Sequence, residues 1–310
     1  MSIFFGVVIP YIAGFVFLGG ILYRIWKWGK SPVPYRIPTT CGQEKTLPWI
    51  KSSYLDCPHN KLGVLGRMAL EILAFRSLFR NTSVEIKQKT QRLVYSHNIA
   101  LWLAALAFHW ALLIILIRHL RYIMISDEGV PFLLEGLASL DGVFEWAVPT
   151  VYLSSIVVVL ALGYLLFRRV SDPQMRFISL PSDYIPLLLL LSVIGSGFLM
   201  VFFWRVDLTQ VKELAISIVT FQPITPAESL GWGFYLHLLL FCILLAYFPF
   251  SKLVHMAGVF LSPTRNLANN SRMERHINPW NHPVKVHTYE EYEDEFRDLM
   301  RAAELPLDKE

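Results

Sequence analysis

Hydrophobic residues in this chain are gathered into five long runs, and charged residues and prolines separate one run from the next. Each run has about the twenty apolar residues that a helix needs to cross the hydrocarbon core of a membrane. The pattern therefore predicts an all-α integral membrane protein with five transmembrane helices. The runs are residues 3–22, 98–123, 146–167, 184–204 and 231–252.

Three further stretches combine apolar and charged residues in a way that favours helices outside the membrane core. Residues 61–80 mix apolar side chains with three arginines, and residues 207–220 place polar residues opposite an apolar stripe. We expect both to be interfacial helices, the first on the inner face and the second on the outer face. Residues 289–304 predict an acidic amphipathic helix in a soluble C-terminal tail, which suits a basic surface on a partner.

The composition agrees with a membrane protein. The 310 residues are 54% hydrophobic and the mean hydropathy is +0.45, values that a soluble enzyme does not have. Cys41, Cys57 and Cys242 form no C-x-x-C pair, which argues against a zinc site or an iron–sulfur cluster held by this chain. A glycine-rich phosphate loop, a nucleophile motif and a nucleic-acid signature are also missing from the sequence, so no nucleic-acid partner is expected.

The distribution of lysine and arginine predicts the orientation. Thirteen of these residues lie between positions 24 and 92, further arginines follow the third and fifth runs, and residues 124–145 contain none. Because basic loops stay on the cytoplasmic side, we expect a multi-pass protein of the cytoplasmic (inner) membrane, with its N-terminus outside and its C-terminus cytoplasmic.

Four segments follow from this topology. Residues 1–22 lack a basic n-region and a small-residue cleavage site, so they are expected to be a transmembrane anchor helix and not a signal peptide. Residues 23–97 are expected to form a cytoplasmic loop with the interfacial helix and a partner-docking surface. Residues 98–255 would be a four-helix core, and residues 256–310 a cytoplasmic tail.

Two of the runs carry two histidines each. His237 and His255 are 18 residues apart, a spacing that returns to the same face of an uninterrupted helix and corresponds to roughly 27 Å of rise. His109 and His119 are ten residues apart, or roughly 15 Å. One such histidine alone is more often hydrogen-bonded inside a bundle than bound to a metal. Two helices with two histidines each, however, can supply both axial ligands to two stacked haems.

Depth in the membrane then pairs the histidines. His109 and His255 lie towards the cytoplasmic side, and His119 and His237 lie towards the outer side. Because the two rises differ by about 12 Å, both haems are expected to tilt, in opposite senses. The alternative is a non-redox membrane scaffold or a proton-coupled transporter that uses intramembrane histidines. Transporters often have internal repeats and helices broken at the midplane, which this sequence does not display.

Two charged residues near the outer surface are candidates for a quinone site. Arg118 would pair with a quinone oxygen or a haem propionate, or would extend to lipid headgroups instead. Glu145, at the start of the third run, is the best-placed proton acceptor, and an ordinary solvated acid is the simpler interpretation. The sequence leaves these alternatives open.

The segments around the histidines resemble a known family. LHLLLFCILLAYFPFSKLVH at 236–255, SIVTFQP at 217–223 and FHWALLIILIRH at 108–119 are similar to the dihaem cytochrome b (gamma) subunit of respiratory nitrate reductase. The resemblance covers roughly residues 98–260. It implies two b haems with bis-histidine ligation, by His109 with His255 and by His119 with His237, and it implies that menaquinol reacts beside the outer haem.

Segments on the expected cytoplasmic side resemble one branch of that family. IPTTCGQEKTLPWIKSS, GRMALEILAFRSLFRNT and NPWNHPVKVHTYEEYEDEF are similar to DsrM, the membrane cytochrome b subunits of the Dsr complex in sulfur-metabolising prokaryotes. This resemblance implies a cytoplasmic iron–sulfur partner similar to heterodisulfide reductase (DsrK-like). It also implies a periplasmic multihaem cytochrome c, a periplasmic iron–sulfur subunit and a second membrane subunit. We therefore expect electron exchange between menaquinol and the cytoplasmic partner, in sulfur or sulfite metabolism.

Overall fold

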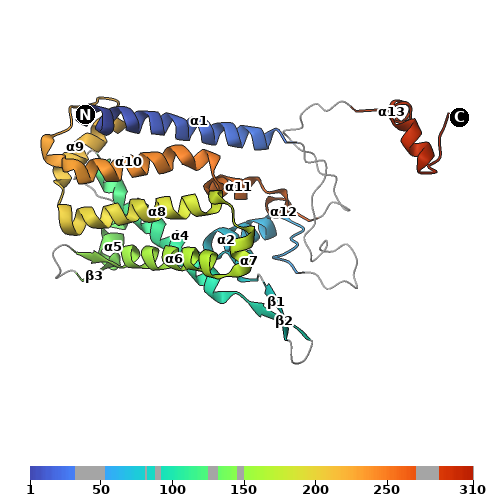
Figure 1. The fold of residues 1–310 in the computed structure, drawn as a ribbon, viewed down its shortest axis with the longest axis horizontal. Coiled ribbons are helices and arrows are strands. Elements are labelled where there is room, and N and C mark those ends of the chain that lie inside the picture. Colours follow the sequence, from blue (N-terminus) through green and yellow to red (C-terminus); the bar gives the residue numbers. More distant parts are fainter. Residues whose placement is uncertain are drawn as a thin grey trace.

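Five long apolar helices lie side by side in the computed structural model (Figure 1), which describes residues 1–31, 53–80, 82–87, 92–124, 132–144, 150–269 and 286–309. All five are long and apolar enough to cross a membrane, which confirms the five predicted spans. They are Phe4–Gly29 (η1, Phe4–Val8, and α1, Ile9–Gly29), Ile99–Tyr122 (α4, Ile99–His119, and η2, Leu120–Tyr122), Leu153–Ser171 (α6), Pro181–Trp204 (α8, Pro181–Leu199, and η3, Met200–Trp204) and Glu228–Phe250 (η4, Glu228–Leu230; α10, Gly231–Tyr247; η5, Phe248–Phe250). The first helix continues seven residues beyond the predicted end at residue 22.

The spans pack in the spatial order α1, α10, α8, α6 and α4. A core of Phe108, Val158, Leu162 and Leu190 joins the last three. Many outward-facing apolar side chains stay exposed, such as Phe203 at 70%, as expected of surfaces that face lipid. The two histidine-bearing helices are held by different neighbours, because α4 packs mainly on α6 whereas α10 packs on α1 and α8.

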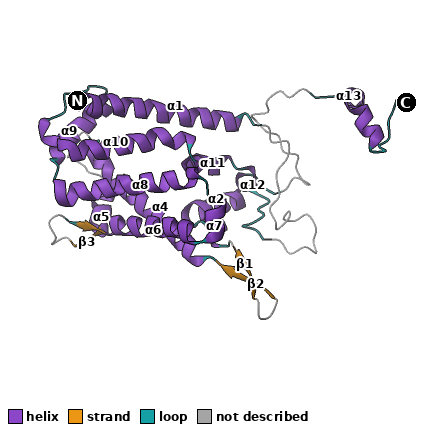
Figure 2. Ribbon diagram, viewed as in Figure 1, coloured by secondary structure: helices purple, strands orange, loops and turns teal. Residues whose placement is uncertain are grey.

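Shorter helices and two antiparallel pairs of short strands lie outside the five spans (Figure 2). These strands were not predicted from the sequence, in which residues 82–92 form a polar segment before the second span. In the structure β1 and β2 pair in antiparallel fashion, with Thr82 opposite His97 and Lys87 opposite Arg92. These elements are α2 (Lys61–Ala74), α3 (Arg76–Phe79), β1 (Thr82–Lys87), β2 (Arg92–His97), α5 (Phe132–Asp141), β3 (Gly142–Phe144), β4 (Val151–Tyr152), α7 (Pro173–Ile178), α9 (Leu208–Val219), η6 (Lys252–Val254), α11 (His255–Gly258), η7 (Val259–Leu261), α12 (Pro263–Asn266) and α13 (Tyr289–Ala302).

The fifth span does not run unbroken to His255, contrary to the prediction of one helix over 231–255. The α-helix ends at Tyr247, a tight turn follows, and Ser251 has an extended backbone with φ −103° and ψ 175°. Pro249 is a physical reason, because proline has no amide hydrogen to continue the helix. His255 therefore begins a new short helix, α11. The rise of roughly 27 Å from His237 to His255 assumed one unbroken helix. That rise no longer applies, and neither does the expectation, derived from it, that the two haems tilt in opposite senses.

Residues 61–80 form two helices where one was predicted. Asn60 caps α2 by accepting a hydrogen bond from the Gly63 amide, and Phe75 interrupts the segment with a left-handed φ of 50°. Asp56 forms ion pairs with Arg76 and Arg80, which attach α3 to the preceding loop.

Burial alone raises the pKa of Asp56, but hydrogen bonds from Arg76, Arg80 and Ser53 outweigh that effect. They hold the pKa of this carboxyl group well below its ordinary value.

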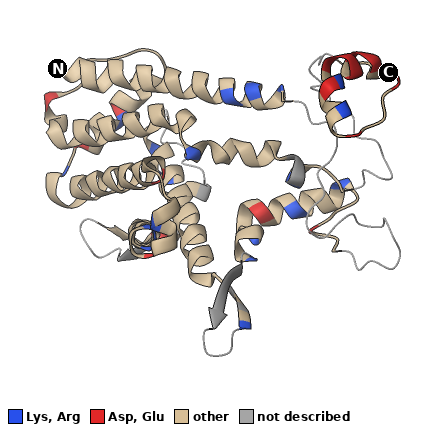
Figure 3. Ribbon diagram, turned by 45° about the vertical axis from the view of Figure 1, so that its right-hand side comes forward, with Lys and Arg blue, Asp and Glu red and all other residues tan. Residues whose placement is uncertain are grey.

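The C-terminal helix α13 confirms the predicted acidic helix and is drawn away from the bundle in Figure 1. Thr288 and Glu291 form a reciprocal cap at its start. Glu293 is almost completely buried, and the backbone amides of Asp308 and Lys309 donate to its carboxylate. Figure 3 shows the acidic residues concentrated on α13 and basic residues near the C-terminal end of α1.

Candidate functional site

α4 places two histidine side chains at different levels of the bundle. His109 lies in its middle and His119 is its last residue. The Nδ1 atom of each ring lies 2.7 Å from the carbonyl oxygen four residues earlier, Ala105 for His109 and Ile115 for His119. A carbonyl only accepts, so Nδ1 carries the proton and Nε2 keeps the lone pair that binds a metal.

His255 has the same arrangement although it lies outside the fifth span. Its Nδ1 donates to the Lys252 carbonyl oxygen at 2.7 Å. The Ser251 hydroxyl caps the preceding turn by accepting from the Leu253 amide at 3.1 Å. The turn thus fixes both the place of this imidazole and its tautomer, with Nε2 again available to a metal.

His237, on α10, is oriented by α8. Its Nδ1 lies 2.9 Å from the Ser196 hydroxyl oxygen, which itself donates to the Val193 carbonyl at 2.9 Å. Because the Ser196 hydroxyl hydrogen is donated to the Val193 carbonyl, the Ser196 oxygen accepts the hydrogen bond from His237 Nδ1–H. Gly197 allows this approach, since a Cβ at that position would lie 3.2 Å from His237 Cε1. Sequence reasoning did not identify Ser196 as the partner of His237.

The structure brings the first predicted pair together. The ring centroids of His109 and His255 are 6.1 Å apart, with the ring planes at 77°. Two imidazoles bound to opposite sides of one metal, each at about 2 Å, have centroids roughly 6 to 6.5 Å apart. The second pair, His119 with His237, stays a prediction from depth. We call the level of His109 and His255 the His109 end of the bundle, and the level of His119 and His237 the His119 end.

The described residues fit haem better than a bare metal ion. Among them, no group of three or more His, Cys, Asp or Glu side chains is placed to bind a metal. Two isolated imidazoles are too few for a stable site of that kind. They are the number that an iron porphyrin requires, because the macrocycle supplies the remaining ligands.

An aromatic residue from the α2–α3 corner reaches the first pair. The Phe75 ring packs edge-on against His109 at 4.8 Å, as does Phe108. Trp102 and Trp110 of α4 donate to the carbonyls of Ala74 and Leu73, which ties the corner to the histidine-bearing helix. The left-handed backbone of Phe75 is uncommon for an aromatic residue, and sequence reasoning did not find this contact.

Of the two quinone-site candidates, the structure describes Arg118. Its guanidinium donates to Asp141 at 2.6 Å and to Ser154 at 3.2 Å, and it lies over the Tyr152 ring at 3.3 Å. This partly buried ion pair was not predicted from the sequence. Arg118 Nε is buried and has no hydrogen-bond partner among the described residues. Glu145 lies outside the described residues.

Comparison with known proteins identifies the family. The model of the nitrate reductase gamma subunit family matches residues 63–275, well over half of the chain. This chain belongs to the nitrate reductase gamma subunit family. The match includes all four histidines, so the resemblance read from the sequence is confirmed.

Individual relatives refine the comparison. The chain is 42% identical to the "Hdr-like menaquinol oxidoreductase cytochrome b-like subunit" of Archaeoglobus fulgidus over 286 residues, which cover 90% of this chain and 84% of the relative. It is 39% identical to the protein of the same description in Archaeoglobus profundus, over 88% of this chain and 81% of the relative. The nitrate reductase gamma chain of Bacillus subtilis is 32% identical over 53% of this chain and 73% of its own length.

Proposed function

We propose that this chain is the membrane cytochrome b subunit of an Hdr-like menaquinol oxidoreductase. In this proposal His109 with His255, and His119 with His237, hold two b haems. The observation that carries it is the set of four imidazoles with Nδ1 already engaged, arranged at two levels of one bundle. The name of the two Archaeoglobus relatives supports the same activity.

The proposal has a direction across the cytoplasmic membrane. We place the His119 end on the outer side, with the N-terminus outside and the C-terminus cytoplasmic. Menaquinol would react at the His119 end, and electrons would leave at the His109 end to a cytoplasmic iron–sulfur subunit similar to heterodisulfide reductase (DsrK-like). Moving one electron across 100 mV of membrane potential involves about 2.3 kcal/mol.

The wider complex is part of the same proposal. It would include a periplasmic multihaem cytochrome c, a periplasmic iron–sulfur subunit and a second membrane subunit, and it would serve sulfur or sulfite metabolism. Residues 32–52 of the expected docking loop and residues 270–285 of the tail lie outside the described residues. The acidic helix α13 remains our candidate for contact with a basic partner surface.

The chain's own residues perform binding, orientation and proton handling. Each bound haem supplies a one-electron carrier. The Nδ1 hydrogen bonds fix the four rings and strengthen them as ligands. Oxidation of menaquinol to menaquinone releases two electrons and two protons, and we assign Glu145 as the group that accepts the protons one at a time and passes them outward to water. The Arg118 Nε–H, which has no partner among the described residues, is the donor that we assign to a quinone oxygen at this end.

An oxidised-minus-reduced visible spectrum of the purified full-length chain tests the proposal. We expect a b-type band from two haems per chain. His109→Ala and His119→Ala should each remove about half of the haem. If either change removed all of it, a single haem would be bound instead. If the unmodified chain gave no b-type band, the scaffold or transporter alternative would stand.

A further inference from the structure

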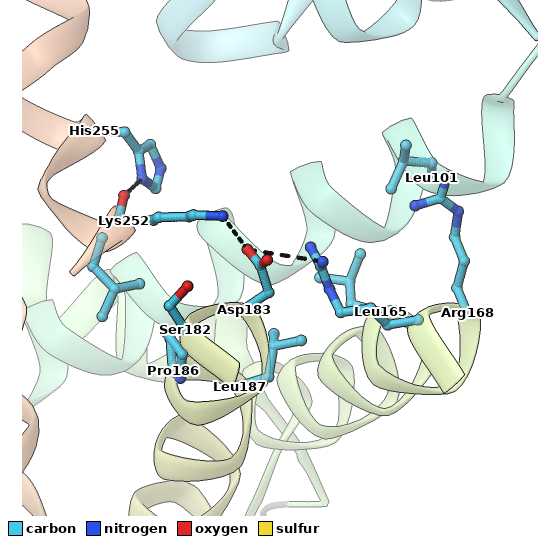
Figure 4. Close-up of a pocket in the computed structure, with 11 residues that line it drawn as sticks. Leu101, Leu165, Arg168, Ser182, Asp183, Pro186, Leu187, Lys252 and His255 are labelled. Atoms are coloured by element: carbon cyan, nitrogen blue, oxygen red, sulfur yellow. Dashed lines mark hydrogen bonds and ion pairs between the residues drawn. The ribbon is translucent and has the colours of Figure 1, made fainter. Parts of the chain in front are cut away.

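A cavity of about 210 Å³ lies beside His255 at the His109 end of the bundle. Residues from the ends of α4, α6 and α8 and from the η6 turn line this open cavity, and Figure 4 shows them. The charged side chains on its walls are Arg168, Arg169, Asp183 and Lys252. Pockets that enclose a whole drug-sized ligand measure about 300–1,000 Å³, so this cavity has room for only part of a large one.

Asp183 holds two of the three cations in place. Its carboxylate lies 2.5 Å from Lys252 Nζ and 3.9 Å from Arg169 Nη1. The Leu180 amide also donates to Asp183, at 3.0 Å, and Arg169 donates to the Ser179 hydroxyl at 2.9 Å. The Asp183 carboxylate is therefore held by the backbone at the start of α8, and it in turn positions the side chains of Lys252 and Arg169.

The third cation is not neutralised. Arg168 extends along the cavity towards Leu101 in Figure 4, away from Asp183. Within the described part of the chain it has no ion-pair partner. The walls thus carry three cations and one carboxylate, an excess of two positive charges. Such a site favours a ligand with two negative charges, and the flat guanidinium of arginine matches the two oxygens of a carboxylate.

We infer that this cavity receives the two carboxylates on the edge of the haem held by His109 and His255. The inference rests on the proposed function and adds the residues that bind that edge. His255, a proposed axial ligand, is itself part of the cavity wall, so the edge of a macrocycle on this ligand can reach the cations. Arg168 pairs directly with the carboxylates, and Asp183 is a positioning residue for Lys252 and Arg169.

Redox titration of the full-length chain, monitored in the visible range, separates the two haems and tests the assignment. Arg168→Gln removes a cation and leaves the carboxylate charge uncompensated, which favours ferric iron, so the midpoint potential of the haem at the His109 end should fall. Asp183→Asn removes an anion and should raise the same potential. The other haem should not shift in either variant. Arg168→Lys retains the charge and should retain the potential.

Arg176→Gln is the matched control, because Arg176 is an exposed arginine of α7 that does not line the cavity. Unchanged potentials in both Arg168→Gln and Asp183→Asn, at normal haem content, would overturn the inference. Loss of one haem per chain in Arg168→Gln, restored in Arg168→Lys, would support it.

The lipid surroundings provide a second discrimination. If the shifts occurred in nanodiscs with phosphatidylglycerol and vanished in phosphatidylcholine alone, the cavity would hold the headgroup of an anionic lipid and the inference would fall. Absence of any b-type band from the unmodified chain would instead sink the proposed function, so the two failures are distinguishable.

Discussion

Replacement of Ser196 by alanine removes the hydroxyl that orients His237 and leaves the ring in place. Ser196 is buried, and its oxygen accepts from His237 Nδ1–H at 2.9 Å. A histidine ligand with such an acceptor is a stronger electron donor to iron. We therefore expect Ser196→Ala to weaken His237 as a ligand and to raise the midpoint potential of the haem at the His119 end.

The size of the effect follows from the value of one hydrogen bond. Such a bond contributes about 1 kcal/mol net, which corresponds to about 40 mV for a one-electron couple. Because the bond persists in both oxidation states of the iron, only part of this energy enters the potential, and we expect a rise of about 10–40 mV. Loss of an outer partner of this kind also lowers metal affinity by about 10- to 100-fold.

The assay is a redox titration of both b-type bands, followed by haem loss to apomyoglobin. Ser192→Ala is the matched control, because Ser192 lies one turn earlier on α8 and donates only to the Leu188 carbonyl. A shift confined to the haem at the His119 end is expected. An unchanged potential in Ser196→Ala, or an equal shift in Ser192→Ala, would refute the role assigned to this hydroxyl.

Three further predictions concern a buried leucine of the bundle, the ion pair of Arg118 with Asp141, and the carboxylate of Asp56. Leu162 has no exposed surface, so Leu162→Ala should destabilise the chain by about 2–5 kcal/mol, read as a lower midpoint of thermal unfolding in detergent. Asp141→Asn leaves Arg118 partly buried without its counter-charge and should cost about 3–5 kcal/mol, whereas Arg118→Met with Asp141→Asn should cost less in a double-mutant cycle. Asp56 has a lowered pKa, so its contribution to local stability is present above about pH 4 and fades below it. Protease sensitivity of Asp56→Asn should exceed that of the unmodified chain at pH 7, and the difference should shrink at pH 3.

The sequence sufficed to predict the five helices, and it led us to propose four histidines as ligands, because both steps use strong local signals. A run of twenty apolar residues has few alternatives to a membrane-crossing helix. Histidine is rare enough in such helices that four of them, spaced in two pairs, mark a site. The pairing of His109 with His255 followed from depth alone, and the two rings lie 6.1 Å apart.

The contacts that support the histidines could not be predicted, because they join segments distant in the chain. Ser196 and His237 are 41 residues apart, and Arg118 and Asp141 are 23 apart. Phe75 reaches His109 only because its backbone is left-handed, which no local pattern announces. One sequence supplies residue types and spacings along the chain, whereas such contacts depend on how the helices pack.

The break after Tyr247 also changes the role of α1. Since His255 lies beyond the end of α10, the η5 turn sets its position, and α1 holds that turn. Arg24 donates to the Pro249 carbonyl at 3.0 Å. Gly20 permits the contact, because a Cβ there would lie 2.6 Å from the Pro249 side chain. The first helix carries no histidine and read as a simple anchor, yet it fixes the turn that presents one of the four proposed ligands.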